Sequence, residues 1–404
     1  MNNNDRILVI NCGSSSLKFA LIELPSGREV VAGIAERLLS AQAVLSYDDR
    51  DGVEQTDEFA AAYGDNHQSA FQCLLTHLQQ GRYLREPLTA VGHRVVHGGE
   101  SFSSSVIIND EVLVGIKNNA RLAPLHNPAN LIGIEAASAA FPDVPHIAVF
   151  DTAFHQSMPA HAYTYAIPKA LYETQGVRRY GFHGTSHQYV SQQAVKQLGL
   201  TLENSAIITA HLGNGCSSCA VLNGKSVDTS MGMTPLEGLV MGTRCGDIDP
   251  SLPEFLANNL DYSSAEITTL LNKESGLLGV SGLSNDMREL RAAINDGNAQ
   301  AKLAVDLFCY RLAKNIGGFA VAIGRLDAVV FTGGIGENDR DVRAQVINQL
   351  GILGIHLDNA RNQANGQQSN GLISPDNGHV HAMVVKTNEE LMIAQDTAAL
   401  VRGK

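Results

Sequence analysis

The sequence predicts an α/β fold of two domains that arose by duplication. Its 404 residues, 44% of them hydrophobic, exceed what one compact domain usually holds. Residues 7–22 (ILVINCGSSSLKFALI) can be laid without a gap on residues 207–222 (IITAHLGNGCSSCAVL), so that Gly13 matches Gly213 and Ala20 matches Ala220. Each copy is typical of a strand, a turn of small residues and a second strand. Two such hairpins predict two related halves.

The rest of the chain alternates strands with helices, as an α/β fold requires. Hydrophobic periodicity predicts helices over residues 129–140, 185–198 and 299–323, and a strand over residues 146–150. We expect an N-terminal domain over residues 1–153, completed by a C-terminal helix over 388–404, and a second domain over 154–387. Residues 362–378 are predicted to form an exposed loop.

Three turns rich in small residues predict phosphate binding. In Gly13-Ser14-Ser15-Ser16 and in Gly213-Asn214-Gly215, backbone N–H groups can point inward and hold anionic oxygens. The third turn, GGIGEN at 333–338, follows a β-branched strand at 328–332 and precedes a helical segment at 342–350. One such turn would be unremarkable, but three in one chain favour a nucleotide.

The common nucleotide-binding motifs are absent. No G-x-x-x-x-G-K-[ST] motif occurs, and no G-x-G-x-x-G follows a strand, which argues against P-loop and Rossmann folds. The remaining fold class is the duplicated two-domain fold of actin, hexokinase and the Hsp70 ATPase. That fold holds ATP in the cleft between its domains.

Charge and cysteine usage exclude several classes of partner. The formal net charge is −12 and Lys and Arg form no stripe, so nucleic acid is not expected. The N-terminus lacks the features of a signal peptide and no long apolar span occurs, so we expect a cytoplasmic protein without a membrane segment. The six cysteines are scattered, and the pair Cys216 and Cys219 lacks a second pair, which indicates buried thiols.

Several polar side chains are candidates for chemistry. Asp151 directly follows the predicted strand at 146–150, where α/β sites gather their ligands. His126 and His183 lie in polar clusters and are the better histidine candidates. The other histidines considered are interpreted as hydrogen-bonded structural residues: His93, His97, His155 and His187.

A series of ordered motifs resembles the acetate and propionate kinase family over essentially the whole chain. They are VINCGSSSLKF, GHRVVHGGE, FDTAFH, RRYGFHGTSH, HLGNG, MGTRCGDIDP, FTGGIGEN and TNEELMIA. The resemblance implies an acetate kinase: a homodimeric enzyme that reversibly transfers a phosphoryl group from ATP to acetate, giving acetyl phosphate and ADP. It also implies a requirement for Mg²⁺, or Mn²⁺ in its place.

The resemblance also implies which residues bind the metal and the nucleotide. Asn11 and Glu389 correspond to the metal-binding positions, and oxygen ligands suit Mg²⁺. The positions that correspond to ATP contacts are Lys18, His211, Leu212, Gly213, Asn214, Gly215, Asp286, Met287, Arg288, Gly334, Ile335, Gly336, Glu337 and Asn338.

Other positions correspond to substrate binding and catalysis. Arg94 matches the carboxylate-binding arginine, and its planar fork suits a two-oxygen anion. His183 and Arg244 match groups that stabilise the transferred phosphoryl group. Asp151 matches the family's proposed acid/base, but acetate is already ionised at neutral pH, so we expect Asp151 to orient other groups or to contact the metal shell. His126 is expected to assist at the acyl phosphate.

An apolar pocket implied by the resemblance sets the length of the acid. Its residues are Val96, Leu125, Phe182 and Pro235, beside Arg94. The branched Val96 narrows the pocket and favours acetate over propionate. A propionate or butyrate kinase remains an alternative, to be separated by substrate ratios. A non-catalytic actin-like or chaperone ATP switch is a more distant one, since it would need no carboxylate-binding arginine.

Overall fold

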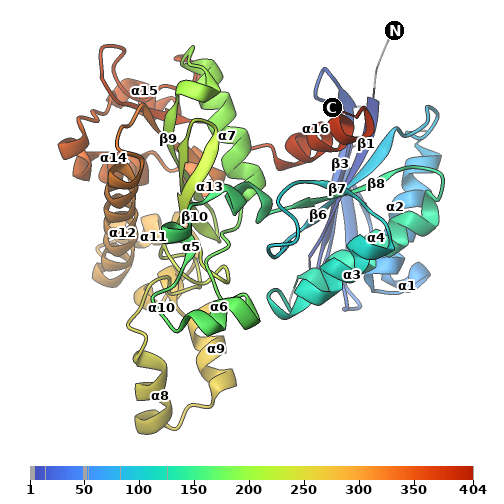
Figure 1. Ribbon diagram of the computed structural model, residues 1–404, viewed down its shortest axis with the longest axis horizontal. Coiled ribbons are helices and arrows are strands. Elements are labelled where there is room, and N and C mark those ends of the chain that lie inside the picture. The colour runs from blue at the N-terminus through green and yellow to red at the C-terminus, as the bar shows by residue number, and fades with distance from the viewer. Residues whose placement is uncertain are drawn as a thin grey trace. The chain divides into compact units, whose positions relative to one another are not determined.

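The computed structural model describes residues 5–13, 15–48, 52, 54–81, 83–124 and 126–403. The chain divides into two units (Figure 1). The smaller consists of Met1–Phe154 together with Asn388–Lys404, and the larger of His155–Thr387. The division therefore lies one residue after the boundary expected from the sequence, and the C-terminal segment belongs to the smaller unit.

The smaller unit is built on an eight-stranded sheet with the order β5-β4-β3-β2-β1-β6-β8-β7. Strands β1 to β5 are antiparallel neighbours, whereas β1, β6 and β8 run parallel. The strands are β1 Asp5–Cys12, β2 Leu17–Leu24, β3 Arg28–Glu36, β4 Val44–Asp48, β5 Glu54–Asp57, β6 Ala90–Val95, β7 Val106–Ile107 and β8 His146–Phe150. The helices are α1 Ala60–Tyr63, α2 His67–Gln80, α3 Asp110–Asn118, α4 Asn127–Ala140 and α16 Glu389–Val401.

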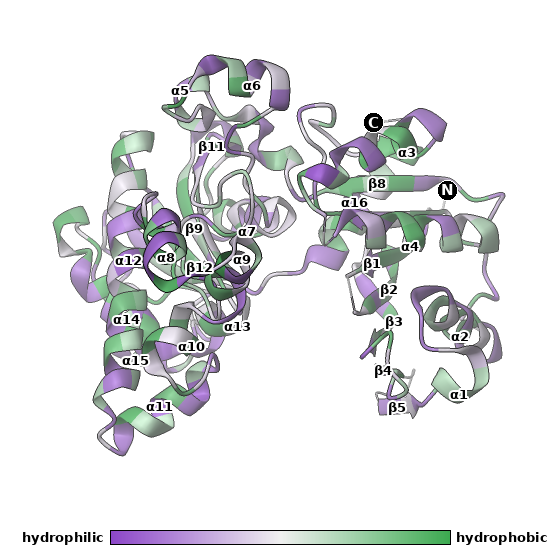
Figure 2. Cartoon of the chain, turned by 90° about the horizontal axis from the view of Figure 1, so that it is seen from below, coloured by the Kyte–Doolittle hydropathy of each residue, from purple (hydrophilic) through white to green (hydrophobic). Residues whose placement is uncertain are grey.

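Both faces of the central strand β1 are buried, which explains its continuous apolar sequence. Because side chains alternate along a strand, Leu8 and Ile10 face the core that contains Phe71 of α2. Ile7 and Val9 face the opposite core, which contains residues of α16. Strand β8, whose residues are all buried, is green over most of its length in Figure 2. Helix α16 thus closes a core whose strands lie more than 200 residues earlier in the chain.

The larger unit contains a five-stranded sheet with the order β11-β10-β9-β12-β13. Its strands are β9 Ala206–Leu212, β10 Cys216–Leu222, β11 Lys225–Thr229, β12 Ala328–Thr332 and β13 His381–Val384. Its helices are α5 Ala160–Tyr163, α6 Lys169–Gln175, α7 Gly184–Gln197, α8 Leu252–Leu260, α9 Ser264–Lys273, α10 Gly276–Ser281, α11 Met287–Asn295, α12 Ala299–Ile323, α13 Gly333–Asn338, α14 Arg340–Gln349 and α15 Asn359–Gln363. Across the described ranges, no helix is long and apolar enough to span a membrane.

The two sheets share one core topology. In the smaller unit, β3-β2-β1 are antiparallel and β6 and β8 then add in parallel to β1. In the larger unit, β11-β10-β9 are antiparallel and β12 and β13 then add in parallel to β9. The predicted duplication is therefore confirmed at the level of strand order and direction.

The gapless alignment of the two hairpins is wrong beyond the turn. Cys12 pairs with Leu17 across the first hairpin, whereas Leu212 pairs with Cys216 across the second, so the second turn is one residue shorter. As a result Ala20 pairs with Val9, but Ala220 pairs with Ile208. The number of turn residues sets the register of a hairpin, and a one-residue slip cannot be seen in a short match of small residues. Ser14, in the first turn, lies outside the described residues.

The third predicted turn is a short helix. Gly333, with φ of 76°, turns the chain out of β12 and opens α13. The Glu337 carboxylate accepts hydrogen bonds from the Gly333 N–H (3.0 Å) and the Thr332 hydroxyl (3.3 Å). These bonds satisfy groups at the start of the helical turn, which explains why a glycine-rich segment is helical here.

The segment 362–378 is only partly an exposed loop. Ile373 and Ser374 are buried, and Leu372 forms an isolated bridge with Met383 of β13. The backbone N–H of Ile373 also donates to Ala382. The sequence signal missed this because two apolar residues stand between stretches of Asn, Gln and Gly.

Candidate active site

A bidentate ion pair lies where three adjacent strands of the smaller unit end. Arg94, near the end of β6, donates from Nε to Oδ1 of Asp151 (2.9 Å) and from Nη2 to Oδ2 (2.6 Å). Asp151 follows β8, and Asn11 of β1 accepts a hydrogen bond from Nη1 of Arg94 (3.2 Å). Because β1, β6 and β8 are parallel neighbours, their carboxyl ends bring these three residues together.

The ion pair fixes the orientation of the Arg94 guanidinium and leaves some of its N–H groups able to bind an anion. Asp151 is 2% exposed and Arg94 22% exposed. Burial disfavours the charged form of Arg94, but Asp151, Glu389 and Glu390 outweigh it and raise its pKa. Arginine has five N–H donors, and the contacts with Asp151 and Asn11 use three of them. Two remain for an anion such as a carboxylate.

Glu389 and Lys18 complete this group. Lys18 is exposed and pairs with Asn11 across the β1–β2 ladder. Glu389 is the first residue of α16, and burial raises its pKa to about 7. Arg94 and Lys18 offset this effect, while Asp151 and Glu390 add to it.

The predicted metal ligands fit a divalent cation. Burial and the neighbouring acids keep the Glu389 carboxyl group partly protonated. A bound cation would supply the positive charge that stabilises its ionised form. Asn11 supplies a carbonyl oxygen and Glu389 a carboxylate, both hard ligands. Sequence reasoning missed Glu390, although it stands beside Glu389 in the motif TNEELMIA.

Val96 and His126 are the remaining predicted residues of this unit that the structure describes. Val96 follows β6 and is 7% exposed. His126 is the residue before α4 and is only partly exposed, while Leu125 lies outside the described residues. Asn130 of α4 was missed by sequence reasoning. Its amide donates to the carbonyl of Cys12 (2.6 Å) and accepts from the N–H of Val96 (3.0 Å), so it ties β1 to the start of the predicted pocket.

In the larger unit, His183 stands at the start of α7 in a left-handed conformation, with φ of 55°. Its Nδ1 shares a hydrogen bond with the hydroxyl of Ser217 (2.8 Å), and its ring stacks on His211 with 4.4 Å between ring centroids. Ser217 also bonds Nε2 of His187 (2.7 Å). A non-glycine residue in this backbone region is strained, and such strain often occurs at functional sites.

Sequence reasoning missed Ser217. The signal available was a pair of serines, Ser217 and Ser218, inside a strand that is otherwise apolar.

Arg244 reaches the turn of the second hairpin. A Cβ on Gly215 would lie 3.0 Å from Nη2 of Arg244 and 3.5 Å from Cε1 of His183. Nη1 of Arg244 donates to the carbonyl of Pro235 (2.8 Å), and burial lowers the pKa of the guanidinium. His183, His211, Gly215 and Arg244 therefore form one cluster, and the missing side chain of Gly215 makes their approach possible.

The other predicted nucleotide residues of this unit lie on three segments. Leu212 is buried at the end of β9 next to Gly213, and Asn214 accepts a hydrogen bond from the Asn285 amide (3.0 Å). Asp286 caps α11, and its hydrogen bonds from Arg288 lower its pKa to about 2. Met287 is buried and Arg288 is 91% exposed.

On α13, Gly334 and the amide of Asn338 are exposed, whereas the Glu337 carboxylate binds backbone groups. Gly334 and Asn338 are exposed, and the Asn338 amide donates to the Gly334 carbonyl (2.9 Å). Ile335 is partly exposed and Gly336 is buried. Glu337 binds the backbone of its own unit, including the Thr387 N–H (3.0 Å), and so acts in positioning the segment.

The two pocket residues predicted for the larger unit differ in their surroundings. Phe182 is 2% exposed, and its carbonyl shares a hydrogen bond with Nε2 of His155 (3.0 Å). Pro235 is partly exposed and holds Arg244 through its carbonyl. Pro235 therefore also positions a catalytic candidate.

The histidines interpreted as structural behave as expected, and five of the six cysteines are buried, whereas Cys245 is partly exposed. His93, His97, His155 and His187 are all buried and all take part in hydrogen bonds. All six cysteines are free. Burial raises the pKa of Cys12 and of Cys216 to about 12, so both remain neutral thiols beside the predicted phosphate turns.

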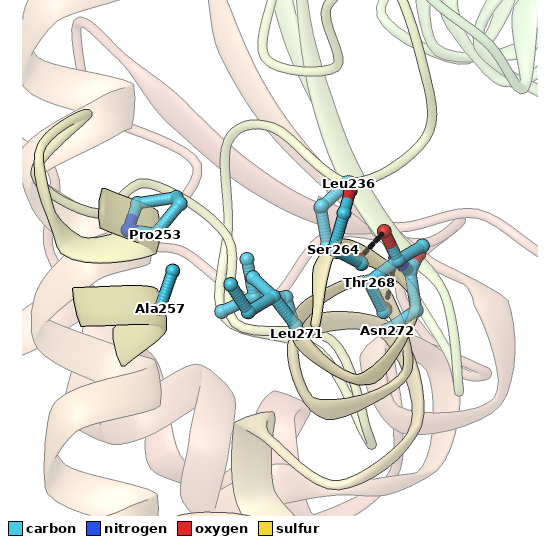
Figure 3. A pocket seen from close by; sticks show the side chains of 8 residues that line it. Leu236, Pro253, Ala257, Ser264, Thr268, Leu271 and Asn272 are labelled. Atoms are coloured by element: carbon cyan, nitrogen blue, oxygen red, sulfur yellow. Dashed lines mark hydrogen bonds between the residues drawn. The ribbon is translucent and has the colours of Figure 1, made fainter. Parts of the chain in front are cut away.

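An apolar pocket of about 400 Å³ lies against α8 and α9 (Figure 3). Its lining consists of Leu236, Pro253, Ala257, Ser264, Ile267, Thr268, Leu271 and Asn272. None of these residues is charged, so the pocket does not suit a phosphate or a carboxylate. The candidate active site is therefore assigned by its polar clusters and not by this cavity.

Comparisons with known proteins identify the family of the chain. The sequence profile of the acetokinase family matches residues 6–395. An acetate kinase of Deinococcus radiodurans is 54% identical over 397 residues, which cover 98% of each chain. The crystal structure of Porphyromonas gingivalis acetate kinase has a TM-score of 0.91 and 44% identity, covering 98% of this chain and 100% of that one. A propionate kinase from Francisella tularensis has a TM-score of 0.90 and 46% identity, covering 98% and 99%. The family predicted from the sequence is thus confirmed: the chain belongs to the acetokinase family.

Proposed function

We propose that this protein is an acetate kinase that reversibly transfers the terminal phosphoryl group of ATP to acetate. The products are acetyl phosphate and ADP. The observation that carries the proposal is the Arg94 guanidinium, oriented by Asp151 and Asn11 with two N–H groups remaining. A fixed planar cation of this kind suits a two-oxygen anion.

In the proposed reaction, Arg94 holds acetate so that one carboxylate oxygen faces the terminal phosphorus. A new P–O bond forms to acetate while the bond to ADP breaks. Acetate is ionised at neutral pH, so no proton need be removed. Asp151 therefore serves to orient Arg94, which agrees with its bidentate ion pair.

His183 and Arg244 are proposed to donate to the oxygens of the transferred group. Charge spreads over those oxygens in the transition state, so fixed cationic donors contribute most of the stabilisation. Ser217 holds the ring of His183, and Pro235 holds Arg244. The turn from Gly213 to Gly215 would hold phosphate oxygens through its backbone.

The metal is proposed to be Mg²⁺, with Mn²⁺ as a substitute, held by Asn11 and Glu389. Bound there, it would neutralise charge on the phosphates of ATP. The raised pKa of Glu389 supports this assignment, because a divalent cation favours the ionised carboxylate.

The preference for acetate is proposed to depend on Val96. Replacing Val96 by Ala enlarges the space beside Arg94, and an added methylene gains about 0.8 kcal/mol where there is room for it. Val96→Ala should therefore raise kcat/KM for propionate relative to acetate by about fourfold. An unchanged ratio of the two kcat/KM values would show that Val96 does not limit the length of the acid.

The decisive experiment is hydroxylamine trapping of acyl phosphate in the presence of ATP and Mg²⁺. We expect kcat/KM to fall from acetate to propionate to butyrate, and trapped product to fall sharply in Arg94→Ala at the acetate concentration that saturates the unmodified protein. Equal or better use of propionate would make the enzyme a propionate kinase with the same mechanism. Nucleotide binding without acyl phosphate from any of the three acids would favour the ATP switch instead.

A cytoplasmic homodimer is also proposed. The six free cysteines support a reducing compartment. The dimer rests on the resemblance to the family, and light scattering of the purified protein would test it.

A further inference from the structure

Three side chains of metal-ligating type meet at the edge of the smaller unit. Asp57 ends β5, and Cys73 and His77 lie on α2. Their ligand atoms all lie within 4.8 Å of one another. Strand β5 is at the outer edge of the sheet, separated from β1 by β4, β3 and β2. This cluster is therefore distinct from the site around Arg94.

The spacing of the three groups resembles that of a tetrahedral metal site. Cys73 and His77 are four residues apart, so they lie one above the other on one face of α2. Nε2 of His77 is 2.8 Å from Oδ2 of Asp57, and Sγ of Cys73 is 3.6 Å from the same oxygen. Zinc bonds of about 2.0–2.3 Å at tetrahedral angles separate their ligand atoms by about 3.3–3.6 Å. Only small side-chain movements would be needed to admit an ion.

Exposure and charge at the cluster also suit a cation. Cys73 is fully buried, whereas the side chains of His77 and Asp57 are 21% and 40% exposed. The open side of the cluster thus faces solvent, where a water molecule could be the fourth ligand. Among the described residues, the ion pair found for Asp57 is with His77, and no Lys or Arg is paired with this carboxylate.

A further hydrogen bond holds the His77 ring in a suitable orientation. The hydroxyl of Tyr47, on β4, lies 3.2 Å from Nδ1 of His77. This leaves Nε2 directed at Asp57 and Cys73. Metal-binding histidines nearly always have such a partner on their second nitrogen.

We propose that Asp57, Cys73 and His77 form a binding site for one Zn²⁺-like transition-metal ion, with water as the fourth ligand. A thiolate and an imidazole favour such an ion over Mg²⁺, which prefers oxygen ligands. The ion would link the edge strand β5 to α2, so its role is structural. It is separate from the catalytic metal proposed above.

Binding would require the thiol to lose its proton to solvent. Burial, with a further contribution from Asp57, raises the pKa of Cys73 to about 12, so the thiol is neutral without metal. The ion replaces this proton and balances the negative charge of the thiolate and of Asp57.

Cobalt(II) is the probe for the first test, because a thiolate bound to Co²⁺ gives a charge-transfer absorption that oxygen ligands do not. The protein is freed of metal with a chelator, and Co²⁺ is added in the presence of excess Mg²⁺. We expect one thiolate-bound Co²⁺ per chain, lost in Cys73→Ser and retained in Cys309→Ser. Cys309 is the matched control, a buried thiol on α12 of the larger unit.

Absence of the charge-transfer band in the unmodified protein would overturn the proposal, as would its persistence in Cys73→Ser. If Cys73→Ser does not fold, His77→Gln decides the matter. That variant keeps the thiol and should weaken Co²⁺ binding by more than about tenfold. Unchanged affinity would overturn the site.

Thermal unfolding provides a readout that is independent of the thiol. Zn²⁺ should raise the unfolding midpoint of the unmodified protein, because it binds the folded state. The increase should be absent in Asp57→Asn, which preserves the shape of the side chain. An equal increase in both proteins, or no increase in either, would contradict the proposal.

Discussion

Arg94 is the residue on which the proposed carboxylate site of the smaller unit depends. Asp151 engages one edge of its guanidinium, and Asn11 accepts from Nη1. The same cation also lowers the pKa of Glu389 against the effect of burial. If Arg94 binds the acid as proposed, one side chain couples acid binding to the charge balance of the site.

Replacing Arg94 by Ala should impair both activity and stability. Removing one partner of a mostly buried pair leaves the Asp151 carboxylate uncompensated and costs about 3 kcal/mol. The acetate KM should rise far more than the ATP KM, since all the predicted nucleotide contacts except Lys18 lie in the larger unit. Steady-state kinetics and urea denaturation measure the two effects. Arg94→Lys, which keeps the charge but loses the bidentate fork, should recover stability more than activity.

Glu389 should make stability depend on pH when no metal is present. Its pKa is about 7 in the folded protein against 4.5 for the ordinary group, so between these values the folded state keeps a proton that the unfolded chain has lost. The contribution of this proton to the free energy of unfolding is complete below pH 4.5 and is lost as the pH rises toward 7. The decrease is at most about 3 kcal/mol.

Glu389→Gln removes this dependence and is the test. In EDTA, the variant should be more stable than the unmodified protein at about pH 8, and the difference should vanish at about pH 4.5. Urea denaturation at each pH measures it. Parallel pH profiles for the two proteins would show that Glu389 titrates normally.

At the scale of elements, the two hairpins place small residues where polar side chains converge. In the second hairpin, the turn at 213–215 leaves room for Arg244 and His183. The first hairpin contributes Asn11 and Lys18 from paired positions on β1 and β2. A hairpin thus supplies both a turn and a pair of side chains to its site.

Gly215→Ala should lower kcat by roughly tenfold or more, because the added methyl group would press on Arg244, which is proposed to stabilise the transferred phosphoryl group. Neither Gly213 nor Gly215 has a positive φ, so alanine strains neither backbone. Gly213→Ala is the matched comparison, since its Cβ would lie 3.5 Å from the Gly215 carbonyl, an ordinary contact. Equal losses in the two variants would show that the approach of Arg244 is not what matters.

At the scale of the whole molecule, the C-terminal segment Asn388–Lys404 belongs to the smaller unit, which also contains the N-terminal part of the chain. Helix α16 covers the core formed by Ile7, Val9, Ile22 and Ile147, and it carries Glu389. The last helix therefore completes the core and carries a ligand of the proposed metal site of the smaller unit.

Deleting residues 388–404 should unfold the smaller unit preferentially. The truncation uncovers one face of its sheet, including side chains that are 0–2% exposed. Hydrogen exchange should lose protection in β1, β2 and β6 and keep it in β9, β10 and β12. A chain that lacks only residues 403–404 serves as the control, because it keeps the ion pair of Arg402 with Asp5 of β1. Uniform loss of protection across both sheets would show that the units do not fold separately.

The sequence by itself determined the fold class, the duplication, the family and most of the regular elements, such as the helix Ala299–Ile323 and the strand His146–Phe150. These depend on local periodicity, turn residues and ordered motifs, which are visible in one dimension. It could not determine the register of the hairpins, because a three-residue and a four-residue turn look alike when their residues are small. It also missed the helical form of Gly333–Asn338, which depends on hydrogen bonds to Glu337.

Only the tertiary structure decided which polar groups meet. Asn11, Arg94, Asp151 and Glu389 are far apart in sequence and are joined because parallel strands end at one edge and α16 returns to it. The ion pair of Arg94 with Asp151, the raised pKa of Glu389 and the cluster of Asp57 with Cys73 and His77 follow from distance and burial. Such properties arise from contacts between remote segments, and a sequence pattern records residue types without recording those contacts.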